Sequence, residues 1–158
     1  TAVFRYPSMH STLGDAADAL AGMLRTLGDT AHVVAHSLGG LVTCEAFARH
    51  ADLPGGRIVL LGAPVRGSRT ARAVASHWYG PVALGPLALA ELARERDPVA
   101  LPAREVGVIA GSLPVGAGRI FADLPAPNDG TVCLDETELP GRTSRIVLEV
   151  SHTGMLFS

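Results

Sequence analysis

A short apolar run that ends in a tight turn and continues as a helix lies in the first third of this 158-residue chain. Residues 31–35 are apolar enough for a short buried strand, and apolar side chains recur at helical spacing over residues 41–47. Between them, residues 35–40 have the sequence Ala-His-Ser-Leu-Gly-Gly. The small residues Ala35 and Gly39 leave space for backbone and substrate on both sides of the serine. The segment therefore predicts a strand, a tight turn bearing a serine, and a helix.

Ser37 lies at the centre of this turn, where a serine hydroxyl is held above the sheet. The following helix directs its free N–H groups and the positive end of its dipole at the same place, so the backbone amide of Leu38 can stabilise an oxyanion. The sequence predicts Ser37 as a catalytic nucleophile and Leu38 as an oxyanion donor. The alternative is that Ser37 serves only as the N-cap of the helix.

Strand and helix patterns alternate along the whole chain. We expect strands at residues 1–6, 31–35, 57–61, 105–111 and 144–150, and helices at residues 13–27, 41–50, 70–78 and 84–96. The strand at 57–61 is almost wholly apolar, as strands buried on both faces of a parallel sheet are. The alternation predicts an α/β fold, with a mostly parallel sheet of about five strands flanked by helices.

The length of the chain is suited to a single domain over residues 1–158. Residues 69–104 are rich in Ala and Leu and are interrupted by prolines. This segment is expected to form either a cap over the active site or an ordinary pair of connecting helices.

A serine hydroxyl is a weak nucleophile at neutral pH, so it needs a neutral imidazole as base and an acid that orients the imidazole. His152 directly follows the last expected strand, and Asp129 lies in the polar turn Asn128-Asp129-Gly130. Ligands of open parallel sheets bind at the carboxyl ends of the strands, where both loops fall. We predict His152 as the base and Asp129 as its acid partner. Asp129 could alternatively be a turn residue that caps its own backbone.

The loop at residues 62–68 follows the third expected strand, and we expect Pro64 and Val65 to line the substrate pocket. His36 precedes the serine, and its side chain is expected to point away from the Ser37 hydroxyl. The other possible bases and acids on the chain are expected to be structural or solvated: His10, His32, His50, His77, Asp123 and Asp135.

The composition excludes several other functions. The net charge is −2 and the arginines are scattered, so nucleic acid is not an expected partner. Cys44 and Cys133 match neither a metal spacing nor a disulfide framework, and we expect both to be packed thiols. No apolar run reaches the ~18 residues that cross a bilayer, so the sequence predicts a soluble protein without a transmembrane segment.

These motifs resemble the α/β-hydrolases, and within them the bacterial lipase- and esterase-like members. The resemblance rests on residues 6–8, 33–42, 60–68, 128–132 and 151–152. It implies hydrolysis of a small-molecule or lipid ester through an acyl-enzyme, without cofactor or metal. Ser37 would be the nucleophile, His152 the base and Asp129 the acid.

The chain departs from this family at two points. Ala35 stands where the family usually has glycine, and the sequence contains no His-Gly pair for the second oxyanion donor. The strand bearing that pair is expected upstream of Thr1, so the domain is expected to be incomplete and this segment alone to have reduced activity. In the family that strand separates those represented here by residues 1–6 and 31–35. We therefore expect an empty slot between these two segments, or an unusual pairing that closes it.

Two other classes of function remain open at this point. The same three side chains serve acyltransferases, thioesterases and amidases, because the acyl acceptor depends on pocket polarity and on access of water. A non-catalytic α/β-hydrolase scaffold is a further alternative, although a binding module has no need of all three residues. The sequence does not predict an oligomeric state.

Overall fold

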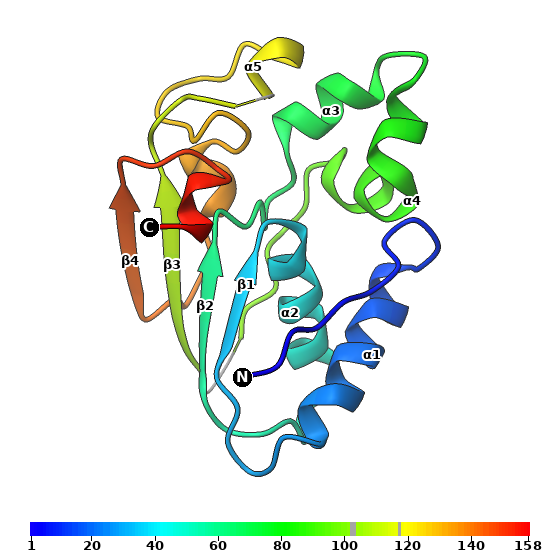
Figure 1. The fold of residues 1–158 in the computed structure, drawn as a ribbon, viewed down its shortest axis with the longest axis vertical. Helices are drawn as coiled ribbons and strands as arrows, with labels where there is room; N and C mark the ends of the chain where they lie inside the picture. The colour runs from blue at the N-terminus through cyan, green and yellow to red at the C-terminus, as the bar shows by residue number, and fades with distance from the viewer. Residues whose placement is uncertain (102–103, 117) are drawn as a thin grey trace.

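The computed structural model describes residues 1–101, 104–116 and 118–158, and its centre is a parallel β-sheet (Figure 1). The described residues form four strands in the order β1-β2-β3-β4. Their bounds are β1 (Val33–His36), β2 (Arg57–Leu61), β3 (Glu105–Gly111) and β4 (Ser144–Leu148). All neighbours are parallel, and the register aligns His36 with Leu61, Leu61 with Ile109, and Ile109 with Ile146. The residues that follow the four strands therefore emerge at the same end of the sheet, along the edge formed by the carboxyl ends of the strands.

Helices connect the strands. They are α1 (Leu13–Arg25), α2 (Leu38–Arg49), α3 (Arg69–Ala75), α4 (Gly80–Leu92) and α5 (Gly118–Phe121), with short 3₁₀ turns η1 (Leu134–Thr137) and η2 (Gly154–Leu156). Two of the helices, α1 and α2, cover one face of the sheet (Figure 1). The face that carries Ile58, Leu60 and Val108 is buried with residues of α1 and α2 in one core. Val34 and Ile146, on the opposite face by register, are exposed. The α/β class is confirmed.

Helix α1 begins where its sequence predicts. Thr12 is the N-cap, its hydroxyl accepts a hydrogen bond from the Asp15 amide, and the Asp15 carboxylate accepts one from the Thr12 amide. This reciprocal capping box satisfies two donors that a helix start leaves free. The helix ends at Arg25 rather than at Leu27 as expected, and Gly28 follows with a φ of +89°.

The expected strand at residues 1–6 is wrong. The segment is extended, and the alternation reflects one-sided packing: Phe4 and Tyr6 stack with ring centroids 5.6 Å apart and pack against the core, whereas Val3 is exposed. A strand also needs a partner for its backbone groups, and in the described residues this segment joins no ladder. The sheet therefore has four described strands rather than about five.

The slot expected beside β1 is present. In the described part of the chain β1 pairs only with β2, so its other edge is open. A groove of about 360 Å³ separates this edge from the N-terminal segment, and its lining includes Val3, Phe4, Val33 and Val34. The open slot, rather than an unusual pairing, is the alternative that the structure shows.

Residues 69–104 contain a pair of helices beyond the carboxyl ends of the strands (Figure 1). Helix α3 ends at Ala75, three residues earlier than expected, and α4 starts at Gly80 and is kinked at Gly85, whose φ is +75°. A proline at position 86 removes a backbone donor there, which accounts for the kink. The two helices pack against each other, and a cap function for them stays a prediction.

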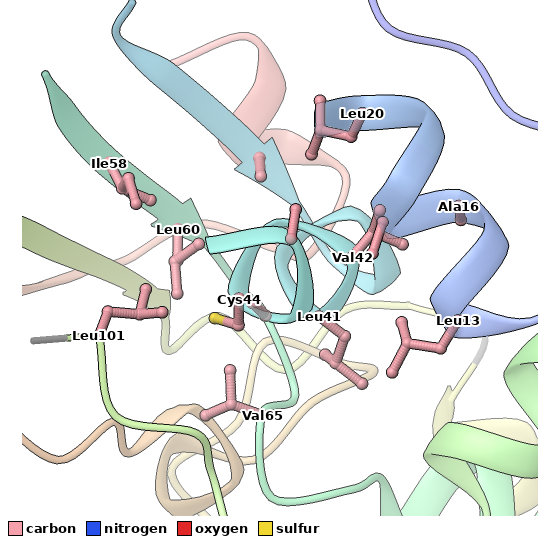
Figure 2. Close-up of a cluster of buried hydrophobic side chains, with 14 of the residues drawn as sticks. Leu13, Ala16, Leu20, Leu41, Val42, Cys44, Ile58, Leu60, Val65 and Leu101 are labelled. Atoms are coloured by element: carbon pink, nitrogen blue, oxygen red, sulfur yellow. The ribbon is translucent and has the colours of Figure 1, made fainter. Parts of the chain in front are cut away.

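The start of helix α2 packs against the loop after β2 because of one glycine. Figure 2 shows Leu41, Val42 and Cys44 of this helix in a cluster with side chains of α1 and of the sheet. A Cβ on Gly40 would lie 2.4 Å from the Ala63 Cβ, which no flexible side chain can relieve. A Cβ on the neighbouring Gly39 would meet nothing within 4 Å. The absence of a side chain at Gly40 therefore sets how deeply the start of α2 can pack.

We predict that Gly40→Ala destabilises the protein, because α2 must move away from Ala63. Overpacking of this kind costs about 1–3 kcal/mol, and each kcal/mol lowers the melting temperature of a domain of this size by about 2–4 °C. Gly39→Ala is the matched control and should leave the melting temperature unchanged or raise it, since alanine is the better helix former. Thermal unfolding followed by circular dichroism measures both. Equal melting temperatures for the two variants would contradict this packing argument.

Candidate active site

Ser37 occupies the turn between the end of β1 and the start of α2, with a strained backbone. Its φ of 52° and ψ of −126° make it the one non-glycine residue in the described chain with a positive φ. Such a conformation costs of order 1–3 kcal/mol and persists only where the surroundings impose it. The Ser37 amide donates to the Leu61 carbonyl at 3.0 Å, which ties the turn to the neighbouring strand.

The hydroxyl of Ser37 does not cap the helix. Ser37 is the N-cap residue of α2 by position, but its side chain forms no capping hydrogen bond, so the structure gives the hydroxyl no helix-capping role. Within the described residues, the Leu38 amide donates to no backbone carbonyl. It lies in the first turn of α2, where amides have no helical acceptor, and the first backbone bond of this turn runs from the Gly40 amide to the Ser37 carbonyl. The turn therefore presents an unused hydroxyl and an unused N–H group at the same helix end.

Asp129 and His152 are joined by a short hydrogen bond. His152 Nδ1 lies 2.7 Å from Asp129 Oδ2, and the Asp129 side chain is 1% exposed. The other carboxylate oxygen accepts from the amides of Thr131 and Val132 at 2.9 and 2.7 Å. Since a carboxylate only accepts, Nδ1 is assigned the proton and the Nε2 of a neutral ring keeps its lone pair. This is the tautomer that can take up a proton at Nε2.

A backbone hydrogen bond also joins Asp129 and His152. The His152 amide donates to the Asp129 carbonyl at 2.9 Å, so the loop after β4 is bonded to the loop after β3. Asp129 thus has both a capping role in its own turn and a bond to His152. The two alternatives that the sequence leaves open for this residue are not exclusive.

Two glycines at strand ends leave space for the pair. A Cβ on Gly62, which follows β2 with a φ of +52°, would lie 3.1 Å from His152 Nδ1 and 3.2 Å from Asp129 Oδ2. A Cβ on Gly111, at the end of β3, would lie 2.7 Å from the Asp129 Cβ. Sequence reasoning missed both residues, although a glycine directly after an apolar strand is a detectable pattern.

His36 reaches the His152 loop. Its Nε2 lies 2.9 Å from the His152 carbonyl oxygen, and the two ring centroids are 4.6 Å apart. Burial lowers the pKa of His36 below its ordinary value. This contact brings the residue next to Ser37 and the backbone of His152 together. In the described residues the Ser37 hydroxyl itself forms no hydrogen bond with the His152 ring; such bonds often tighten only when substrate binds.

The two residues predicted to line the substrate pocket are buried instead. Val65 is 3% exposed and belongs to the core near α2, as Figure 2 shows, and Pro64 is buried more completely. The loop after β2 turns inward, where apolar side chains lose their contact with water. Pro64 and Val65 are therefore shielded from solvent in this structure, and contact of either side chain with a substrate stays a prediction.

The competing acids and bases have other partners. Asp135 forms a two-bonded ion pair with Arg69, and His50 contacts Asp18. His77 Nδ1 lies 2.8 Å from the Ala73 carbonyl, and His32 Nδ1 accepts from the Arg57 amide. None of these contacts involves the turn at Ser37.

The described residues contain neither a metal-binding cluster nor a membrane-spanning helix. In them no group of three or more His, Cys, Asp or Glu side chains could hold a metal ion. Across the same ranges no helix has the length and apolar character needed to cross a bilayer.

No family model and no curated protein sequence matches this chain. Several solved structures are similar to it. The chain is similar to the mature form of the Bacillus licheniformis lipase BlEst2, at a TM-score of 0.69 and 22% identity over 92% of this chain and 69% of that one. For the propeptide form of the same lipase the TM-score is 0.77 at 21% identity, and the chain spans only 38% of it.

A second neighbour is the meta-cleavage product hydrolase CumD from Pseudomonas fluorescens IP01. The TM-score is 0.54 at 15% identity, over 94% of this chain and 68% of that one. A structure of RedJ follows at a TM-score of 0.51 and 19% identity. All these neighbours have one fold in common, and its strand–turn–helix unit and parallel sheet are those described above: the chain has the α/β-hydrolase fold, in part.

Proposed function

We propose that this protein is a serine hydrolase that cleaves carboxylic esters through an acyl-enzyme. The observation that carries the proposal is the strained turn that holds the half-buried Ser37 at the carboxyl ends of the strands, where Asp129 and His152 are already paired. A strained nucleophile turn beside an oriented imidazole is the arrangement that activates a serine. Two of the structural neighbours, a lipase and a meta-cleavage product hydrolase, are themselves hydrolases, which supports this class of reaction.

The proposed reaction begins with attack of the Ser37 hydroxyl oxygen on the ester carbonyl. His152 Nε2 takes the hydroxyl proton, and the Asp129 carboxylate stabilises the imidazolium that forms. The Leu38 amide donates to the oxyanion of the tetrahedral intermediate. His152 then returns the proton to the leaving alcohol, and water attacks the acyl-enzyme by the same steps to release the carboxylic acid.

Small-molecule or lipid esters are the proposed substrates. Thioesters, amides and acyl acceptors other than water remain alternatives, because the same residues serve all of them. Product analysis distinguishes them: release of the free acid identifies a hydrolase, whereas an acylated acceptor identifies a transferase.

The first prediction of this proposal concerns covalent labelling. A fluorophosphonate probe should attach to Ser37 with loss of fluoride, and Ser37→Ala should abolish the labelling. Ser112→Ala is the matched control, because Ser112 also follows a strand at the same edge but its hydroxyl donates to the Leu148 carbonyl. Mass spectrometry of the labelled peptide measures the site. Equal labelling of wild type and Ser37→Ala would exclude Ser37 as the nucleophile.

The second prediction concerns the acid. In Asp129→Asn the amide oxygen can accept from the Thr131 and Val132 amides, which leaves the NH₂ group facing His152 Nδ1 and favours the wrong tautomer. We expect kcat for a nitrophenyl ester to fall by about 10⁴-fold, as in serine proteases. Asp123→Asn, an exposed acid on the same connection, should retain wild-type kcat. A modest loss in Asp129→Asn, matching the control, would argue against its role.

A further inference from the structure

His152 must reach the nucleophile from the far side of the sheet. It follows β4, whereas Ser37 follows β1, and β2 and β3 lie between them. The residues after Leu148 bring the His152 ring over the end of β2, where a Cβ on Gly62 would lie 3.1 Å from its Nδ1. The position of the imidazole relative to Ser37 therefore depends on what holds this loop once it has crossed the sheet.

Three hydrogen bonds hold His152, and two of them are made with Asp129. Its ring Nδ1 and its amide both bond to Asp129, at 2.7 and 2.9 Å. Its carbonyl oxygen lies 2.9 Å from His36 Nε2. The first two bonds fix His152 to the loop after β3, and only the third bonds it to the strand that ends at the nucleophile.

The chemistry of this third bond identifies which ring nitrogen of His36 carries a proton. A carbonyl only accepts, so Nε2 of His36 must be the donor. The ring is half-buried, which lowers its pKa and favours the neutral form. A neutral ring 4.6 Å from the His152 ring places no like charge beside the imidazolium that the proposed reaction forms. His36 can therefore hold His152 without opposing its protonation.

We propose that His36 is a positioning residue that ties the base loop to the nucleophile strand through its hydrogen bond to the His152 carbonyl. This inference rests on the proposed function for its kinetic consequence, but the bond and its effect on the His152 ring do not. Because His36 is adjacent to Ser37, the tie sets the distance between hydroxyl and imidazole directly. A displacement of 1 Å at such a site can cost about 10²-fold in rate.

Two substitutions of His36 distinguish the effect of its hydrogen bond from the effect of its ring contact with His152. His36→Phe keeps an aromatic ring against His152 and removes the donor, and His36→Gln keeps an N–H donor at similar reach. We expect His36→Phe to lower kcat by about 10- to 100-fold with KM nearly unchanged, and His36→Gln to recover most of the loss. His32→Phe and His32→Gln are matched controls, since His32 precedes the same strand and bonds a backbone amide at the opposite end. Both controls should retain wild-type kcat.

A second measurement needs no activity. Nitrogen-detected NMR of the imidazoles should report a single Nδ1–H tautomer for His152 in wild type and in His36→Gln, and an averaged or broadened ring in His36→Phe. Melting temperatures identify any variant that loses stability as a whole.

The outcomes separate the two proposals. Wild-type kcat and an unchanged His152 tautomer in His36→Phe would overturn the positioning role, as would equal losses in His36→Phe and His36→Gln. If wild type hydrolyses no ester and yet His36→Phe alone loses the His152 tautomer, the proposed function fails and the positioning role stands.

Discussion

The parallel direction of all four strands is the constraint on which the rest of this structure depends. Parallel neighbours cannot be joined by a hairpin, so each connection must cross the molecule and return to the same edge. The register from His36 to Ile146 brings the four carboxyl ends level with one another. Loops that are far apart in the sequence thus meet at one edge, and the candidate site consists of these loops.

Hydrogen bonds between the loops, more than contacts within each loop, define the site. The Ser37 amide is bonded to the end of β2, and His152 is bonded on one side to Asp129 and on the other to His36. Asp129 is buried and has donors on both oxygens, so its carboxylate is satisfied without water. The glycine at position 62 permits this arrangement, because a side chain there would meet both partners of the pair.

A glycine also permits close packing on the face of the sheet that α2 covers. Helix α2 carries the free N–H groups behind Ser37, and its start lies against Ala63 because Gly40 has no side chain. The depth of that helix fixes where its first amides point. Packing in the core and the orientation of the proposed oxyanion donor are therefore coupled through a single residue.

Sequence alone was sufficient for the periodic elements and for the turn. The strands at 57–61 and 105–111 and the capped start of α1 follow from local patterns, since each depends on neighbours in the chain. Residues 1–6 show the limit of such patterns: alternation predicts which side chains face inward, but only tertiary structure decides whether a backbone partner lies alongside. Val65 shows it again, because a loop residue can turn toward the core or the solvent with the same neighbours. Loop order predicts the pairing of Asp129 with His152, whereas no pattern predicts the bond from His36, because only the folded sheet brings its Nε2 within 2.9 Å of the His152 carbonyl oxygen.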